Sequence, residues 1–301
     1  HRIARRQRQM CIRDRDISDE KEKVKRIFQW VQNNIKYVAF EDGLGGFIPR
    51  EAADVYQKKY GDCKDMSSII VKMLEIANVT AHLTWIGSRD RPYTYEQVPS
   101  PIVDNHMIAA VKIDNEYVFL DATGEYLPFG LPTSMIQGKE ALIGLNESDF
   151  DLVKVPIVPK EKNQRVEKNQ LTIEGNNLLG TATTQLTGYQ KVFAEYNKIN
   201  ADSDNLPFFD IFLQQGNNKF EVTDIKDEGF FSQEEAINID YDFGIPDYVK
   251  KVGDKIYVNL NIDKKFYHGD IELEKRELDM EMEYQYLNTY EMDLQIPEGY
   301  I

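Results

Sequence analysis

The sequence predicts an α+β fold, in which a helical N-terminal part is followed by short strands. Before residue 80, apolar residues recur at intervals of three and four positions, which is the spacing of one face of a helix. After residue 80 the apolar runs become short and are separated by turn-forming residues, as in strands. Helices that precede an antiparallel sheet place the first half of the chain in the α+β class. The second half continues with short runs, so we expect it to be mostly β and sandwich-like.

Three helices are expected in the N-terminal part. The first begins with a capping box, in which Ser18 and Asp19 are the capping residues and Glu22 follows Asp19 after three positions. The third begins at Cys63, carries an apolar stripe and ends near Asn78. The expected helices span residues 18–33, 52–59 and 63–78.

The strands that follow are expected to form an antiparallel sheet. Asp114 and Asn115 make a two-residue turn between two apolar runs, so these runs are neighbours in a hairpin. A register centred on this turn places residue 121 opposite residue 108, close to residue 106. The expected strands are residues 80–86, 107–113 and 117–120.

Two domains joined by a linker are expected. Residues 156–170 contain Pro156, Pro159 and several charges, and we interpret them as the linker. The domains are then residues 17–155 and residues 171–301. The elements expected after the linker are hairpin strands at 171–173 and 178–186, helices at 188–200 and 208–215, and strands at 220–225, 236–241, 255–262 and 278–286.

The first 16 residues differ from the rest of the chain. They contain six Arg and two Asp, in a protein whose net charge is −15. We interpret residues 1–16 as a non-native or disordered leader, and a native basic arm is the alternative. If Cys11 is foreign, Cys63 is the only native cysteine and a disulfide within this chain is excluded. The chain has no initiator Met and no signal peptide, so we expect an excerpt of a longer protein, with residues 171–301 truncated.

The composition excludes several classes of protein. Hydrophobic residues make up 42% of the 301 residues and aromatic residues 11%, as in folded globular proteins. A net charge of −15 repels phosphate backbones, so nucleic acid is not an expected partner. No run approaches the ~20 apolar residues that cross a bilayer, so no membrane-spanning segment is expected. His and Cys residues do not cluster at metal-ligand spacing, so no metal or other cofactor is expected.

Cys63 is the candidate nucleophile. It lies in the first turn of an expected helix, where backbone N–H groups and the helix dipole favour a thiolate. Its neighbours Asp62 and Lys64 fit a polar cleft, and a buried core cysteine is the alternative. A thiolate nucleophile needs a base, and the base needs a group that orients it. The hairpin offers both, because His106 begins one strand and Asp121 ends the next. The alternatives are a structural histidine and a turn-capping aspartate.

These residues stand in three motifs: Tyr60-Gly-Asp-Cys-Lys-Asp-Met66, Asn105-His106 and Leu120-Asp-Ala-Thr123. In this order the motifs resemble the transglutaminase-like superfamily, whose fold is that of papain-like cysteine proteases. They are most similar to the bacterial branch with the Gly-Asp-Cys-Lys-Asp signature, which occurs in multi-domain proteins of Bacteroidetes-type bacteria. The resemblance covers residues 17–155 and implies that Cys63, His106 and Asp121 form a catalytic triad without a cofactor. It also implies a location in the periplasm or at the cell surface.

Three aromatic residues are candidates for binding substrate. Trp85, Tyr93 and Tyr95 lie in or just before the loop 87–101, which leads to His106. Exposed aromatic side chains in such a loop bind ligands through their flat apolar faces. Packing of the three rings against the sheet is the alternative.

The function favoured by the sequence is cysteine-dependent hydrolysis of an amide bond in a peptide or protein. Attack by Cys63 would give a thioacyl intermediate, with His106 acting first as base and then as acid. Water would then release the product. Two alternatives stay open: transglutaminase-type acyl transfer to an amine, and a non-catalytic binding or assembly module of the bacterial envelope.

Overall fold

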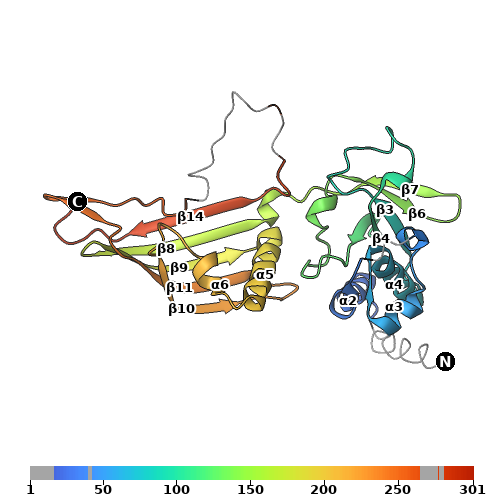
Figure 1. Ribbon diagram of the computed structural model, residues 1–301, viewed down its shortest axis with the longest axis horizontal. Helices are drawn as coiled ribbons and strands as arrows, with labels where there is room; N and C mark the ends of the chain where they lie inside the picture. The colour runs from blue at the N-terminus through green and yellow to red at the C-terminus, as the bar shows by residue number, and fades with distance from the viewer. Residues whose placement is uncertain (1–16, 40–42, 265–276, 278–280) are drawn as a thin grey trace. The chain divides into compact units, whose positions relative to one another are not determined.

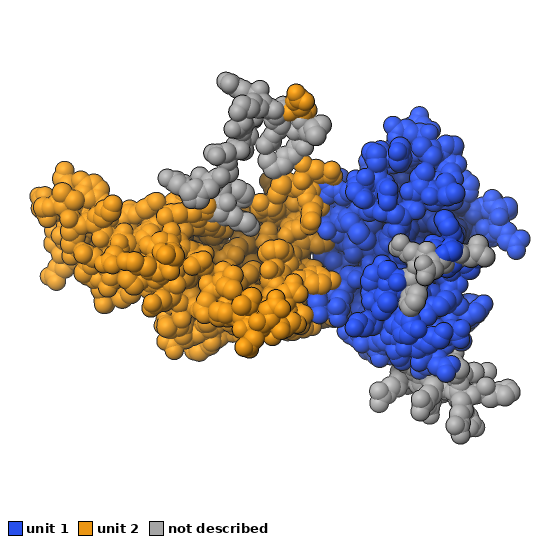
Figure 2. Space-filling model, in the orientation of Figure 1, with its two compact units in different colours: residues 1–157 blue, residues 158–301 orange. Residues whose placement is uncertain are grey.

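The computed structural model describes residues 17–39, 43–264, 277 and 281–301. The chain divides after residue 157 into two compact units (Figure 2). Each unit has its own sheet and its own helices (Figure 1). The leader expected at residues 1–16 lies outside the described residues.

Three helices form one layer of the first unit: α2 (Glu20–Asn34), α3 (Ala52–Lys58) and α4 (Cys63–Ile76). The N-cap of α2 is Asp19, whose carboxylate accepts a hydrogen bond from the N–H of Lys21 at 3.0 Å. Each fully buried apolar side chain of this layer contributes about 1.5–3 kcal/mol to folding. The core between the helices and the sheet includes Val24, Phe28, Met66, Ile70, Leu74, Ala109, Val111 and Leu120.

The sheet of the first unit is antiparallel and has the strand order β5-β4-β3-β6-β7. Its strands are β3 (Ala81–Ile86), β4 (His106–Ile113), β5 (Glu116–Leu120), β6 (Glu140–Gly144) and β7 (Phe150–Lys154). Strands β6 and β7 were not predicted from the sequence, because runs of five residues give a weak alternating signal and Phe150 and Leu152 of β7 are exposed.

Short elements complete the first unit. A parallel pair joins β1 (Lys36–Tyr37) to β2 (Tyr60–Gly61), directly before α4. Three 3-10 turns lie in the loops, at Gly43–Gly46, Pro101–Val103 and Ser134–Ile136.

The hairpin of β4 and β5 has the register predicted from its turn. Ala109 lies opposite Leu120. Asp114 and Asn115 take positive φ angles of 51° and 67°, as the central residues of a tight two-residue turn do. The start of β4 and the end of β5 therefore lie side by side at the same end of the hairpin.

The second unit is built on a five-stranded sheet with the order β10-β11-β9-β8-β14. Its strands are β8 (Gln164–Glu174), β9 (Asn177–Leu186), β10 (Glu221–Glu228), β11 (Ile237–Ile245) and β14 (Leu287–Leu294), and β12 (Lys250–Val252) pairs with β13 (Lys255–Tyr257). Helices α5 (Gly188–Ser203) and α6 (Phe208–Phe212) cover one face of the sheet (Figure 1). Their segment contributes Ala194 and Leu213 to its core. Within the described residues, helices thus take the place that a sandwich-like fold gives to a second large sheet.

The linker expected at residues 156–170 is shorter in the structure. Residues 164–170 form the first part of β8, which follows a 3-10 turn at Lys160–Lys162. Buried positions of this strand carry Glu167 and Asn169 in place of apolar side chains. The alternation of apolar and polar residues that indicates a strand is therefore missing from this part of the sequence.

Two strands near the C-terminus also differ from the prediction. The described residues 281–286 are not in a strand, and residues 278–280 of that expected strand lie outside the described residues. The strand of this region is β14, which runs parallel to β8. The strand expected at 255–262 is reduced to β13, because an Asn259 side-chain turn follows it.

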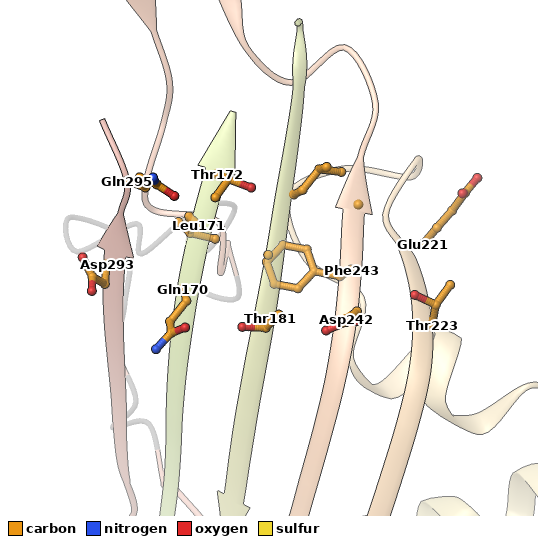
Figure 3. Close-up of a pocket in the computed structure, with 13 residues that line it drawn as sticks. Gln170, Leu171, Thr172, Thr181, Glu221, Thr223, Asp242, Phe243, Asp293 and Gln295 are labelled. Atoms are coloured by element: carbon orange, nitrogen blue, oxygen red, sulfur yellow. The ribbon is translucent and has the colours of Figure 1, made fainter. Parts of the chain in front are cut away.

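The surface of the second sheet is hollowed, as Figure 3 shows. The hollow measures about 850 Å³. Its residues include one row across all five strands, made of Asp293, Gln170, Thr181, Asp242 and Thr223. All of the lining residues belong to the second unit, so the hollow contains none of the candidate catalytic residues.

Candidate active site

Cys63 is the first residue of α4, and it is partly exposed. Asp62 is the N-cap, and its Oδ1 accepts a hydrogen bond from the N–H of Asp65 at 3.1 Å. Oδ2 of Asp65 accepts the N–H of Asp62 at 3.2 Å, which completes a capping box. A Cβ atom on Gly61 would lie 2.5 Å from Cβ of Asp65, so this box requires glycine there. The motif around Cys63 thus fixes where the helix begins and where the thiol lies.

Ser67 ties this end of α4 to the sheet. Its Oγ lies 2.7 Å from the carbonyl oxygen of Cys63 and 2.9 Å from that of Met107, and it donates its proton to one of them at a time. Because Met107 directly follows His106, this contact holds Cys63 beside the start of β4.

His106 and Asp121 form a buried pair at the shared edge of β4 and β5. Nε2 of His106 lies 2.8 Å from Oδ2 of Asp121, and the two side chains are 7% and 1% exposed. Oδ1 of Asp121 accepts hydrogen bonds from the N–H and the hydroxyl of Thr123, at 3.2 and 2.6 Å. Its Oδ2 also accepts the hydroxyl proton of Thr133 at 2.7 Å. The carboxylate is therefore held in one orientation toward the imidazole.

Cys63 lies within range of the same imidazole. After burial and Asp121, it is the next group that shifts the pKa of His106, and it raises that pKa. Since Nε2 is paired with Asp121, Nδ1 is the ring nitrogen that is left for Cys63. The structure thus brings the three residues singled out in the sequence into one chain of contacts, from Cys63 through His106 to Asp121.

The charges of this pair stabilise each other. Burial lowers the pKa of His106, but the Asp121 carboxylate and the contact with Cys63 outweigh burial and raise that pKa to about 10. Burial raises the pKa of Asp121, but His106 and the hydroxyls of Thr123 and Thr133 outweigh it, and that pKa falls to about 2. At neutral pH the pair is therefore an imidazolium and a carboxylate.

Thr133 is a residue that the sequence analysis missed. It lies before a short 3-10 turn in a loop, and no motif marks it. Ser67 was missed for a similar reason, because on α4 it is one of several small polar residues. Thr123, in contrast, belongs to the motif that contains Asp121. Only the folded arrangement shows that Thr133 approaches the carboxylate.

We expect Thr133→Val to weaken the orientation of Asp121. The variant removes a hydrogen bond to a buried carboxylate, so the free energy of unfolding should fall by about 1.5–3 kcal/mol. Trp30 and Trp85, the only tryptophans of the chain, both belong to the first unit, so their fluorescence in urea follows this unit. The exposed Thr80 provides the control, and Thr80→Val should change nothing. Equal urea midpoints for the two variants would contradict this role of Thr133.

The three candidate substrate-binding aromatics occupy different environments. Trp85 lies in β3, opposite Met107 and Leu142, and is half-buried. Tyr93 is exposed. Tyr95 donates its hydroxyl proton to Asp104, so its polar end is used within the loop.

A small cavity is lined in part by Tyr93 and Tyr95. Its volume of about 10 Å³ suits at most one water molecule. The hydrogen bonds of Tyr95, from its N–H to Glu140 and from its hydroxyl to Asp104, do not involve the triad residues. A role of Trp85, Tyr93 and Tyr95 in substrate binding stays a prediction.

The part of the chain that the structure describes contains no group of three or more His, Cys, Asp or Glu side chains that could hold a metal ion.

The match to a family model falls within the first unit. Residues 10–122 match the transglutaminase-like superfamily. No curated protein is similar enough to count as a match.

Two solved structures show a distant likeness. A candidate protease from Parabacteroides distasonis ATCC 8503 has a TM-score of 0.44 and 11% identity, over 84% of this chain and 50% of that chain. LapG of Legionella pneumophila, treated with EGTA, has a TM-score of 0.29 and 14% identity, over 37% of this chain and 57% of that chain. The chain therefore spans only about half the length of either protein.

The family match falls on the unit that carries the three motifs. The described part of residues 10–122 contains helices α2 to α4 and strands β3 to β5. A mostly β region follows. Residues 10–122 of this chain are a domain of the transglutaminase-like superfamily.

Proposed function

We propose that the first unit hydrolyses an amide bond in a peptide or protein. Cys63 is the nucleophile, His106 is the acid and base, and Asp121 orients His106. The observation that carries the proposal is the position of His106, whose Nε2 lies 2.8 Å from Oδ2 of Asp121 and whose pKa is also raised by the nearby side chain of Cys63. This is the arrangement that nucleophilic catalysis by a thiol requires.

The first half of the reaction forms the thioacyl enzyme. The thiolate of Cys63 attacks the carbonyl carbon, and the electron pair of the C=O bond moves to the oxygen. The N–H of Cys63 lies in the first turn of α4, where no intrahelical acceptor exists, so it is available to stabilise this oxyanion. His106 then gives its proton to the leaving amine, and the C–N bond breaks. A pKa of about 10 keeps His106 protonated for this step at neutral pH.

The second half restores the enzyme. His106, now neutral, accepts a proton from water while the water oxygen attacks the thioester carbon. The C–S bond breaks, and the carboxylic acid and the Cys63 thiolate are released. Throughout, the Asp121 carboxylate accepts a hydrogen bond from Nε2–H of His106, which leaves Nδ1 of His106 for the reacting atoms.

A peptide mixture tests this proposal directly. The purified chain is incubated with a digest of a bacterial proteome, and mass spectrometry follows new peptide termini and the mass of the Cys63 fragment. We expect new termini and a transient acyl adduct on Cys63. A parallel incubation with a primary amine separates hydrolysis from acyl transfer, since transfer adds the amine to the new carboxyl end. The absence of both cleavage and adduct would contradict the proposal and favour the binding module.

We also propose that the protein acts in the periplasm or at the cell surface. This rests on the resemblance of its motifs to envelope proteins of the superfamily. No helix in the described ranges is long and apolar enough to cross a membrane. Fractionation of the source cells provides the test, and recovery in the cytoplasmic fraction alone would contradict this location.

A further inference from the structure

The first turn of α4 contains two carboxylates, and each has its own cation. Oδ2 of Asp62 lies 2.6 Å from Nζ of Lys64. Oδ2 of Asp65 lies 2.7 Å from Nη2 of Arg50. Asp62, Lys64 and Asp65 are 3%, 7% and 2% exposed. The pair of Asp62 and Lys64 is therefore nearly dry and is formed by the direct sequence neighbours of Cys63, whereas the Arg50 side chain of the second pair is 27% exposed.

Helix capping accounts for Asp62 but not for Lys64. A capping residue needs only an oxygen that accepts an N–H, and serine does this about as well as aspartate. A charged cap also brings a cost, because a buried carboxylate needs a compensating cation. Lys64 supplies that cation, although its ammonium must itself be withdrawn from water. Helix capping alone therefore does not explain why Asp62 and Lys64 form a buried ion pair here.

The position of the pair beside a nucleophile suggests that explanation. A carboxylate close to a thiol disfavours the thiolate, because the two negative charges repel each other. The helix N-terminus acts in the opposite direction and favours the thiolate. An uncompensated Asp62 would cancel part of this effect at Cys63.

The charges of three ion pairs at the candidate site balance only when Lys64 is present. Three elements carry them: the first turn of α4, the segment before α3, and the shared edge of β4 and β5. With His106 protonated they are three carboxylates and three cations, namely Asp62, Asp65, Asp121, Lys64, Arg50 and His106. Loss of Lys64 would leave this group with a net negative charge before the thiol ionises.

We propose that Lys64 is a positioning residue of the nucleophile: it neutralises Asp62 and thereby maintains Cys63 as a thiolate. Lys64 acts through Asp62, with which it is paired, and takes no part in proton transfer. The inference deepens the proposed function and rests on it, since it assigns how that site activates its thiol.

The test compares the pH dependence of Cys63 alkylation by iodoacetamide in four variants. Peptide-level mass spectrometry reads Cys63 separately from Cys11. Lys64→Met should move the midpoint of the pH profile up by about one unit, which is about a tenfold slower reaction below the midpoint. Asp62→Ser, which retains a capping oxygen, should move the midpoint down. The double variant Asp62→Ser/Lys64→Met should return it close to the wild-type value.

Lys72→Met is the matched control. Lys72 lies on the same helix and pairs with Glu75 at 2.8 Å, but both side chains are half exposed or more. Its midpoint should equal that of the wild type. Tryptophan fluorescence verifies that each variant is folded. If Lys64→Met does not fold, the downward shift in Asp62→Ser and its reversal in the double variant still decide the matter.

A purely structural role would give a different pattern. Unchanged midpoints in folded Lys64→Met and Asp62→Ser, or shifts of the same sign in both, would overturn the inference. The readout needs no substrate. A failure of the proposed peptide hydrolysis would therefore leave these midpoints unaffected, and the two failures can be told apart.

Discussion

Replacement of Cys63 by alanine is expected to lower the hydrolysis rate by at least about 10⁴-fold. Only the sulfur can form the thioacyl intermediate, and neither His106 nor Asp121 can take its place. Cys63 is partly exposed and lies outside the cluster of buried core residues. The free energy of unfolding should therefore change by less than about 1 kcal/mol.

The rate is measured as the appearance of new peptide termini, and the fold is followed by tryptophan fluorescence. Ser68→Ala is a suitable control, because Ser68 lies on the same helix and is also partly exposed. It should retain the wild-type rate. Peptide hydrolysis that survives in Cys63→Ala would show that another group is the nucleophile.

Asp121→Asn should lower the rate by about 10³–10⁴-fold and change its pH dependence. Asparagine has nearly the same shape but offers no charge to the imidazolium. Burial is the largest influence on the pKa of His106 and lowers it. Without the Asp121 charge, which raises it, that pKa should fall by more than one unit from about 10. The alkaline limb of the pH–rate profile should move toward neutral pH.

The same pKa shifts predict how stability depends on pH. The pKa of His106 is raised from 6.5 to about 10, so its contribution is complete below pH 6.5 and is lost as the pH rises through 10. The pKa of Asp121 is lowered from 3.8 to about 2, so its contribution is complete above pH 3.8 and is lost as the pH falls through 2. The wild type should keep both contributions between pH 3.8 and 6.5.

Urea midpoints measured by tryptophan fluorescence between pH 6 and pH 10 test the coupling. In wild type, deprotonation of His106 near pH 10 breaks its ion pair with Asp121. Asp121→Asn has no such ion pair to lose, so the difference between its urea midpoints at pH 6 and pH 10 should be smaller. Asp151 accepts a hydrogen bond from Tyr117 at 2.6 Å and belongs to the same unit, so Asp151→Asn is the matched control. Identical pH profiles of rate and stability in wild type and Asp121→Asn would contradict the assigned role.

The sequence predicts the main features of the candidate site because local chemistry determines them. The start of the helix at Cys63 was predicted from its apolar stripe, and the structure adds a capping box formed by Asp62 and Asp65. The approach of His106 to Asp121 follows from a two-residue turn, since the turn alone sets the register. Both features depend on neighbours in the chain, and such patterns are visible without the fold.

Features that depend on distant contacts are not visible in the sequence. Thr133 contacts Asp121 only because a loop folds back on the end of β5. In the second unit, Glu167 on β8 is fully buried, and its Oε2 lies 2.9 Å from Nη2 of Arg165. This ion pair allows a charged residue at a strand position where the sequence pattern would require an apolar one. The parallel pairing of β14 with β8 joins residues more than 100 positions apart. No short turn connects these two strands, so no local signal in the sequence predicts their pairing.

The most direct test of the account is the pH dependence of Cys63 alkylation by iodoacetamide, in the wild type and in His106→Ala. The proposed pair predicts that wild-type Cys63 reacts rapidly at neutral pH, because the imidazolium of His106 would favour the thiolate. In His106→Ala the reaction should become slow at neutral pH. Slow alkylation of the wild type, with a pH profile that the mutation leaves unchanged, would contradict an assembled Cys63–His106 pair.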